Sequence, residues 1–243
     1  MPPKGAPREA LLILDLINCS LKKLFAPQKF ILRKQTLWLS PARCIFWEEE
    51  KALILSDLHF GKSGHFRKEG IGVPQNIFKE DLQGLFTQIQ FFKPSVLLVV
   101  GDMFHSHANK EIDFFLKWRN DIPKVFIHLI KGNHDVLANK FYEQANIKVT
   151  KQKLAIKNFC FTHDIASVCE EDSEELFTFS GHIHPGIRVN GVGKQSFKLP
   201  CFYFTSKYAV LPAFSMFTGL HKLVPKKADT VFAIVENQVL KMQ

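Results

Sequence analysis

Three apolar runs that end in polar residues, with helix-like segments between them, constrain the fold of this 243-residue chain most strongly. The runs are "ALILSD" (52–57), "VLLVVGD" (96–102) and "KVFIHLIKGNHD" (124–135). Between them, residues 75–92 place apolar side chains at the spacing of a helical face, and residues 110–119 also resemble a helix. Strands that are apolar throughout are typical of parallel sheets covered on both faces. The sequence therefore predicts a β-α-β-α-β unit with functional residues after each strand, where ligand sites form in open α/β sheets.

The rest of the chain is predicted to be mostly β-structure. Short apolar runs such as "FILR", "TLWL" and "CIFW" precede the first buried strand, and further runs follow residue 147. Chains of ~200 to 250 residues with α/β folds commonly form one domain. We therefore expect one α/β domain over residues 28–243. Residues 1–27 are expected to be an N-terminal extension, whose apolar run is interrupted by Asp15 and is much shorter than a membrane span.

Composition indicates which binding partners and which cellular compartment suit this chain. The 32 Lys and Arg residues against 23 Asp and Glu residues give a formal net charge of +9, which favours polyanionic partners. Nucleic acid is the first candidate, although a basic surface can also serve solubility alone. The five cysteines contain no C-x-x-C pair, so we expect neither a disulfide framework nor a thiolate zinc site. A reducing cytoplasm fits this pattern, and no membrane segment is expected.

The polar residues at the predicted strand ends form an inventory of metal ligands without sulfur. They are Asp57, His59, Asp102, Asn133, His163, His182 and His184. Seven groups are too many for one catalytic zinc with three protein ligands, but one shared carboxylate would supply four bonds to each of two metals. Two metals ~3.5 to 4 Å apart suit phosphoester hydrolysis by attack of a metal-bound hydroxide on phosphorus.

Five short blocks occur in order between residues 57 and 184, namely D-x-H, G-D, G-N-H-D, a single His and G-H-x-H. Together they resemble the calcineurin-like metallophosphoesterase superfamily. The resemblance implies a four-layer α/β/β/α sandwich, in which two mixed sheets are flanked by helices and the site lies at the carboxyl ends of strands. It also implies two metal sites that share one aspartate. One metal would be held by Asp57, His59, Asp102 and His184, and the other by Asp102, Asn133, His163 and His182.

The same resemblance assigns roles to two residues that are not metal ligands. His134 would donate a proton or a hydrogen bond to the leaving-group oxygen, and Asp135 would orient its ring. His163 departs from the pattern, because "FTHD" lacks the glycine that many members place beside this ligand. His182 and His184 are expected to serve different metals, although residues two apart on an extended strand point to the same side.

A narrower resemblance lies just beyond the first block. The segments "SDLHFGKSGHFRKEGIGVP" (56–74), "GDMFHS" (101–106) and "LPAFSMFTGL" (211–220) are similar to the bacterial ligase-associated DNA damage response endonuclease family, although Leu220 replaces an expected glycine. That family implies a metal-dependent nuclease or phosphodiesterase that acts on DNA and associates with a DNA ligase and a helicase in repair. Manganese is the expected metal, and iron or zinc would accept the same ligands. Two alternatives stay open: a phosphoesterase of cyclic nucleotides, nucleotides or phosphoproteins, and a non-catalytic scaffold of the same fold.

Four further residues are candidates for contact with substrate. Lys62, His65 and Arg67 lie within ten residues of Asp57. An arginine there could grip a phosphate oxygen pair through two parallel hydrogen bonds. Ordinary surface charge is the alternative for Lys62 and Arg67, and His105 could either touch substrate or close a loop.

Overall fold

A computed structural model of the chain describes residues 26–70, 72–73, 76–105, 110–167, 176–190 and 195–243. The first strand begins at Gln28. Residues 1–25, which make up most of the expected N-terminal extension, lie outside the described residues, so that expectation stays a prediction.

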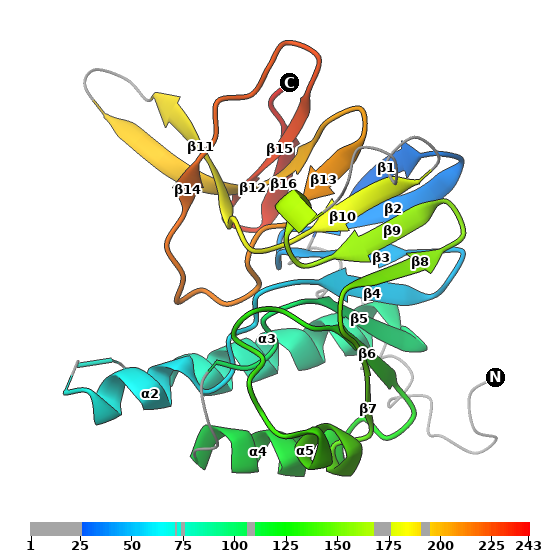
Figure 1. The fold of residues 1–243 in the computed structure, drawn as a ribbon. Helices are drawn as coiled ribbons and strands as arrows, with labels where there is room; N and C mark the ends of the chain where they lie inside the picture. The colour runs from blue at the N-terminus through cyan, green and yellow to red at the C-terminus, as the bar shows by residue number, and fades with distance from the viewer. Residues whose placement is uncertain (1–25, 71, 74–75, 106–109, 168–175, 191–194) are drawn as a thin grey trace, which may run out of the picture.

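The first sheet is mixed and has seven strands, which follow one another in chain order (Figure 1). They are β1 (Gln28–Leu32), β2 (Gln35–Ser40), β3 (Cys44–Trp47), β4 (Ala52–Leu55), β5 (Val96–Val100), β6 (Phe126–Ile130) and β7 (Ile147–Thr150). Neighbours from β1 to β4 pair antiparallel, and neighbours from β4 to β7 pair parallel. The predicted β-α-β-α-β unit is confirmed as the parallel half of this sheet, and its strands all end at one rim.

The second sheet has nine strands and is also mixed. Its main path runs β14-β11-β12-β13-β10-β9-β8, while β15 pairs with β12 and β16 pairs with β15. The strands are β8 (Lys153–Ile156), β9 (Phe159–Thr162), β10 (Phe177–Ser180), β11 (Pro185–Asn190), β12 (Ser196–Phe204), β13 (Tyr208–Val210), β14 (His221–Lys222), β15 (Thr230–Val235) and β16 (Gln238–Lys241). Because β9 and β10 pair in parallel, they also end at a common rim. The short 3₁₀ helix η1 (Ile165–Ser167) follows β9.

Helices pack on the face of the first sheet that points away from the second sheet (Figure 1). These helices are α3 (Ile77–Phe92), α4 (Lys110–Arg119) and α5 (Asn139–Gln144), and the remaining helix of the described residues, α2 (Lys62–Lys68), extends beyond the edge of the sheet. The helices predicted at residues 75–92 and 110–119 are confirmed as α3 and α4. One buried cluster contains Leu82 and Leu85 of α3 and Phe115 of α4. α3 ends where Lys93 adopts a left-handed backbone ahead of Pro94.

Phenylalanine rings fill the space between the two sheets. Phe159, Phe161, Phe177, Phe179 and Phe202 are each at most 1% exposed. Full burial of one such ring contributes ~1.5 to 3 kcal/mol to stability. This core holds the sheets face to face, so the rims at which their parallel strands end lie side by side. The expected pair of mixed sheets flanked by helices is confirmed.

Three cysteines of the described residues, Cys44, Cys160 and Cys201, are free and buried. Burial raises the pKa of the Cys44 and Cys201 thiols to about 12, so both stay protonated and pack as core residues. Among the described residues, no helix combines the length and the apolar character needed to cross a membrane.

Candidate metal centre

All seven candidate ligands lie at the rim where the parallel strands of both sheets end. The first sheet supplies Asp57 and His59 after β4, Asp102 after β5 and Asn133 after β6. The second sheet supplies His163 after β9, and His182 and His184 after β10.

Residues 211–220, which we call the rim segment, join the two sheets at this edge. The main-chain N–H of Leu211 donates to the carbonyl of Ser180 in the second sheet, at 2.8 Å. Three residues later, the N–H of Phe214 donates to the carbonyl of Ser56 beside the first sheet, at 2.9 Å. The rim segment therefore fixes the distance between the ligands of one sheet and those of the other.

Polar contacts hold the rim segment against α3 and against the turn between β2 and β3. The carboxylate of Asp81 on α3 accepts hydrogen bonds from the Ser215 hydroxyl (2.7 Å) and from the Met216 N–H (3.3 Å). The guanidinium of Arg43 donates to the carbonyls of Ala213 and Ser215. Burial raises the pKa of Asp81 to about 6, although these hydrogen bonds oppose the shift. The segment therefore depends on a carboxylate that is costly to ionise.

Asp57, His59 and His184 form one ligand group, in which the ligand atoms lie within 4.8 Å of one another. Nε2 of His184 lies 3.4 Å from Nε2 of His59 and 3.4 Å from Oδ1 of Asp57. The carbonyl of Gly219 accepts a hydrogen bond from the Nδ1–H of His184, at 3.3 Å, so the neutral ring keeps its lone pair on Nε2. Asp57 and His59 are buried and His184 is half-buried, so we call this the enclosed group.

Asp102, His163 and His182 form the second ligand group, and Asn133 adjoins it. Nε2 of His163 lies 3.0 Å from Oδ1 of Asn133 and 3.3 Å from Oδ2 of Asp102. Nδ1 of His182 lies 3.2 Å from the same Nε2 atom. The Val100 carbonyl, 3.3 Å from Nδ1 of His163, fixes the tautomer as Gly219 does in the enclosed group. Because His182 and Asn133 are exposed, we call these four residues the open group.

The two groups touch. The main-chain N–H of His182, in the open group, donates to both carboxylate oxygens of Asp57 in the enclosed group, at 3.1 and 3.3 Å. The charge of Asp102 in turn acts on the ring of His59 as well as on His163. Each aspartate therefore influences both groups.

The residues present fit a divalent cation in each group. When neutral, His163 and His184 each direct a lone pair at other acceptor atoms, an arrangement that is repulsive unless a proton or a cation lies between them. Nitrogen donors held by one ion through bonds of ~2.1 Å lie roughly 3 to 3.5 Å apart. The nitrogen pairs of the two groups, at 3.4 and 3.2 Å, match that spacing.

Burial and mutual contact shift the pKa values of the ligands. Burial lowers the pKa of His59 to about 3, which keeps the ring neutral. Burial disfavours charge on Asp102 and His163 too, but their contact outweighs it, so the pKa of Asp102 falls to about 2 and that of His163 rises to about 9. Without a cation, His163 thus carries a proton, and a divalent ion bound by the group would replace it.

Five of the seven candidate ligands have a left-handed backbone. Their φ angles are 54° at Asp57, 50° at His59, 49° at Asp102, 69° at His182 and 52° at His184. This conformation costs a non-glycine residue ~1 to 3 kcal/mol and clusters at functional sites. His182 and His184 therefore do not follow the extended geometry that their spacing suggests. They lie in different groups, as expected.

Glycines beneath the ligands leave the space that the ligand side chains occupy. A Cβ atom on Gly181 would lie 2.6 Å from Oδ2 of Asp57. A Cβ atom on Gly101, which has φ +80°, would lie 2.0 Å from Nδ1 of His163. The space for His163 thus comes from Gly101, the glycine of the G-D block.

His134 lies beside both groups and belongs to neither. Its main-chain N–H donates to Oδ1 of Asp102, at 2.9 Å. Its half-buried ring packs on the ring of His105, with centroids 4.4 Å apart, and lies 5.6 Å from the ring of His59. A side chain that can carry a proton therefore stands at the edge of the centre.

Asp135 has a different role from the one expected. Its Oδ1 accepts the N–H of Phe104 and its Oδ2 accepts the N–H of Gly132, both at 2.9 Å. The carboxylate thus binds two main-chain amides instead of orienting the ring of His134, because Gly132 lies three residues earlier in its own loop and the fold places Phe104, in the loop after β5, within its reach. Burial raises the pKa of Asp135 to about 7, against these hydrogen bonds. Asp135 ties together the loops that follow β5 and β6.

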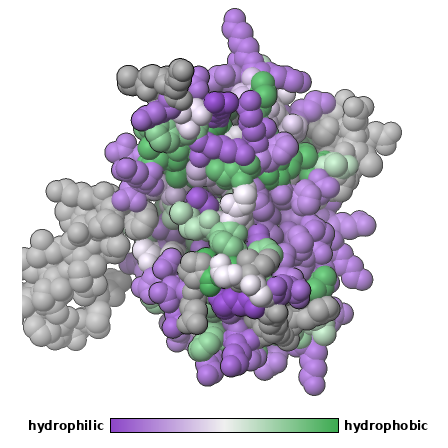
Figure 2. Space-filling view, turned by 90° about the vertical axis from the view of Figure 1, so that its left-hand side faces the viewer, coloured by the Kyte–Doolittle hydropathy of each residue, from purple (hydrophilic) through white to green (hydrophobic). Residues whose placement is uncertain are grey.

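Three of the four candidate substrate residues lie beside the centre. Lys62 on α2 is half-buried, and burial lowers its pKa against the attraction of Asp102 and Asp57. The rings of His65 and His105 lie 5.7 Å apart. Figure 2 shows the molecule from the side on which α2 lies, where a mostly hydrophilic surface is crossed by a band of hydrophobic residues.

The fourth candidate, Arg67, is engaged elsewhere. Its Nη2 atom lies 2.6 Å from Oε1 of Glu111 on α4, and the hydroxyl of Ser63 donates to the same oxygen at 2.7 Å. The guanidinium therefore joins α2 to α4. We expected it to contact substrate beside the ligands, and it is bound to Glu111 instead. The reason is that a partly buried arginine beside a buried carboxylate gains more from that pair than from solvent.

A cavity of about 520 Å³ opens beside the open group. Its lining includes Asn133, His163, His182, Lys131, Lys151 and Lys153. The lysines were not among the residues predicted from sequence. A signal for two of them was present, because Lys131 and Lys151 each directly follow a strand of the ligand rim.

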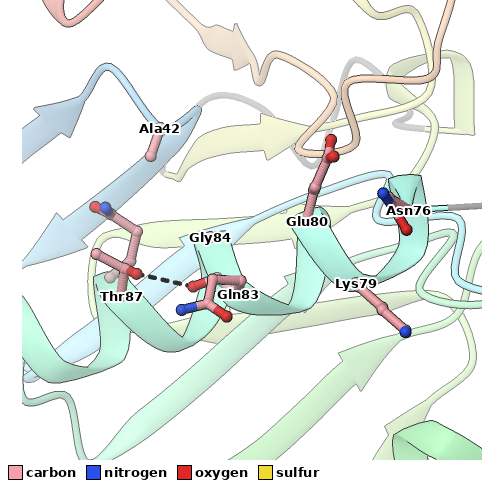
Figure 3. A pocket seen from close by; sticks show the side chains of 8 residues that line it. Ala42, Asn76, Lys79, Glu80, Gln83, Gly84 and Thr87 are labelled. Atoms are coloured by element: carbon pink, nitrogen blue, oxygen red, sulfur yellow. Dashed lines mark hydrogen bonds between the residues drawn. The ribbon is translucent and has the colours of Figure 1, made fainter.

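A second hollow, of about 480 Å³, runs along α3 (Figure 3). The side chains of Lys79 and Glu80 point away from each other, and the Thr87 hydroxyl donates to the Gln83 carbonyl. Among the described residues that line it there is no imidazole and no thiol. The ligand chemistry therefore lies at the rim and not along α3.

Comparisons with known proteins agree with this geometry. The sequence model of the calcineurin-like phosphoesterase family matches residues 51–213, which is more than half of the chain and includes all seven candidate ligands. The comparison with curated proteins gave no match.

Among solved structures, the nuclease MPE of Pseudomonas putida aligns with a TM-score of 0.75 and 24% sequence identity, over 89% of this chain and 100% of that one. The phosphoesterase Yfce of E. coli aligns with a TM-score of 0.38 and 14% identity, over 75% of this chain and 86% of that one. The first of these likenesses establishes a shared fold. With the family match over residues 51–213, it follows that this chain is a hydrolase and belongs to the calcineurin-like phosphoesterase family.

Proposed function

We propose that the protein is a binuclear metal-dependent phosphodiesterase that cleaves nucleic acid, with DNA as its substrate. The observation that carries this proposal is the contact between the enclosed group and the open group, made by the N–H of His182 and the carboxylate of Asp57. Two cation sites that touch in this way suit a phosphoryl group bound between them.

Each group has a defined part in this proposal. One divalent ion would be held by Asp57, His59 and His184, and the other would be held by Asn133, His163 and His182. Asp102 is shared, in keeping with the family resemblance and with its influence on residues of both groups. When bound, the two ions would polarise the phosphoryl oxygens and lower the pKa of a water molecule between them. We take manganese as the metal, because it accepts nitrogen and oxygen donors without sulfur.

The protein's own residues hold the geometry and supply a proton. The carbonyls of Gly219 and Val100 fix the tautomers of His184 and His163, so that Nε2 of each neutral ring has a lone pair with which it would bind an ion. His134 is held by its main-chain bond to Asp102 and by ring contact with His105. From that position its imidazole donates a proton or a hydrogen bond to the leaving-group oxygen.

Charge supports a polynucleotide substrate. The formal net charge of +9 favours a polyanion over a small diester, which carries a single negative charge. Lys62 places an ammonium near the ligands. The similar fold of a Pseudomonas putida nuclease is consistent with the same class of substrate. On the sequence resemblance alone, we further propose a role in DNA repair in the cytoplasm, with a DNA ligase and a helicase as partners.

The direct test is an assay of the protein loaded with Mn²⁺ against bis-p-nitrophenyl phosphate, mono-p-nitrophenyl phosphate and single-stranded DNA. We expect cleavage of the small diester and of the DNA. Turnover of the monoester with no turnover of either diester would contradict the proposal and favour a phosphomonoesterase.

A His134→Ala variant tests the proton donor within the same assay. We expect metal content to stay at the wild-type level while diester turnover falls ~100- to 10,000-fold, because general acid catalysis contributes that much. An unchanged rate would remove His134 from the mechanism.

A further inference from the structure

Two lysines extend the ligand rim on the side of the open group. Lys131 directly follows β6, and Lys151 directly follows β7. The last residues of these strands, Ile130 and Thr150, are register partners, and the N–H of Lys131 donates to the carbonyl of Thr150 at 2.8 Å. The two lysines therefore start from adjacent strand ends, at the rim that carries Asn133.

A third lysine approaches the same space from the second sheet. Residues 151–152 connect β7 at the edge of the first sheet to β8 at the edge of the second. Lys153 begins β8 and is the register partner of Thr162, the residue before His163. Lysines from both sheets thus line the 520 Å³ cavity that His163 and His182 also line.

This cavity, which we call the lysine groove, carries positive charge that metal binding does not require. Against three lysines, its lining contains one carboxylate, that of Asp164. The ammonium of Lys131 lies 5.8 Å from the ring of the buried Tyr142, a contact that restricts its position, while Lys151 is exposed. A cavity of this size lies within the ~300 to 1,000 Å³ range of small-ligand sites, enough for one nucleotide. Lysine binds phosphate as a point charge and tolerates a range of backbone geometries.

We propose that the groove of Lys131, Lys151 and Lys153 binds a phosphate of the polynucleotide next to the one that is cleaved. The substrate strand then runs from the two ligand groups across the ends of β6 and β7. This inference rests on the proposed function, because it takes the scissile phosphate to lie at the ligand groups. A small diester has no second phosphate, so the groove predicts a preference for oligonucleotides.

The test compares Lys131→Ala, Lys151→Ala and the double variant with the wild type, all loaded with Mn²⁺. The substrates are a single-stranded oligonucleotide and bis-p-nitrophenyl phosphate. For each lysine removed, we expect kcat/KM on the oligonucleotide to fall ~3- to 10-fold more than kcat/KM on the small diester. The slope of log affinity against log salt should become shallower by ~0.7 to 1 per lysine.

Two controls separate charge from general surface effects. Lys124 is an exposed lysine before β6, at the end of that strand opposite to Lys131 and ~20 Å away. Lys124→Ala should leave the preference for oligonucleotide unchanged. Lys151→Arg keeps the charge and should keep the salt slope. Equal losses on both substrates, or an unchanged preference and slope in the double variant, would overturn the inference.

Binding of a fluorescent oligonucleotide, measured by anisotropy, distinguishes failure of this inference from failure of the proposed function. If the wild type cleaves no diester, the proposed function fails. The groove is still supported if the double variant binds the oligonucleotide more weakly and with a shallower salt slope than Lys124→Ala. If the wild type cleaves diesters and the double variant binds like the wild type, only the groove fails.

Discussion

The enclosed and open ligand groups share imidazole and carboxylate donors but differ in their surroundings. The rim segment reaches the enclosed group, where the Gly219 carbonyl contacts His184, and the group contains the fully buried Asp57. The open group includes the exposed His182 and faces the lysine groove. Similar donor chemistry is therefore shielded from solvent on one side and open to it on the other. On the proposed function, this difference predicts that the enclosed group would retain its ion more tightly and that the open group would meet the incoming substrate.

The largest effect is expected from Asp102→Asn, which tests whether the two groups are coupled. Asn can still accept the N–H of His134, but it removes the charge that both groups share. We expect diester turnover to fall by more than ~100-fold, since loss of even an outer partner of a metal ligand costs ~10- to 100-fold. Metal analysis should show reduced occupancy in both groups.

His182→Ala is the matched variant for that experiment, because His182 belongs to the open group alone. We expect it to lose one metal equivalent and to keep the other. Should Asp102→Asn also keep one full equivalent, Asp102 would serve the open group only, and the coupling between the groups would be disproved. Thermal unfolding of both variants shows whether the fold is retained.

An intermediate effect is expected from Arg67→Ala, which tests the α2 side of the enclosed group. Because the change leaves the buried carboxylate of Glu111 without this partner, we expect the free energy of unfolding to drop by about 1 to 2 kcal/mol. KM should change less than ~3-fold, whereas Lys62→Ala should raise KM because its ammonium lies near the ligands. A tenfold rise in KM with unchanged stability would instead support a direct contact between Arg67 and the substrate.

The smallest effect is expected from Asp81→Asn, which tests the support of the rim segment. Because burial raises the pKa of Asp81 to about 6, the folded protein holds this proton more tightly than the unfolded chain, whose pKa is near 3.8. The stability that this group contributes is therefore full below pH 4 and is lost as the pH rises to 6. Asn cannot ionise, so denaturant unfolding should show a flatter pH dependence in the variant. Parallel curves would exclude Asp81 as the cause.

The convergence of the candidate ligands at one rim could be predicted from sequence, because their positions depend on local pattern. Apolar runs at residues 52–57 and 96–102 each end in Asp, and parallel strands bring such ends to one rim. The helix at 75–92 was predictable for the same reason, since its buried face is set by its own spacing.

Partners that are distant in sequence could not be predicted in this way. Arg67 meets Glu111 only because α2 lies beside α4, and nothing near Arg67 in the chain indicates that neighbour. Asp135 was expected to orient His134, but the fold brings the N–H of Phe104 within its reach. The left-handed backbone conformation of five candidate ligands was also not predicted, because no sequence pattern indicates a positive φ angle at an Asp or a His. The sequence pattern identifies the candidate reactive groups, and tertiary packing determines the hydrogen-bond partners and the backbone conformation of each one.

The rim segment also sets the order in which this enzyme can become competent during synthesis. The ligands span residues 57 to 184, and the carbonyl that fixes His184 belongs to Gly219. A ribosome-bound chain can pair the strands of the first sheet long before the residues that close the centre have been made. Hydrolytic capacity therefore requires residue 219, which is made long after the last strand of the first sheet.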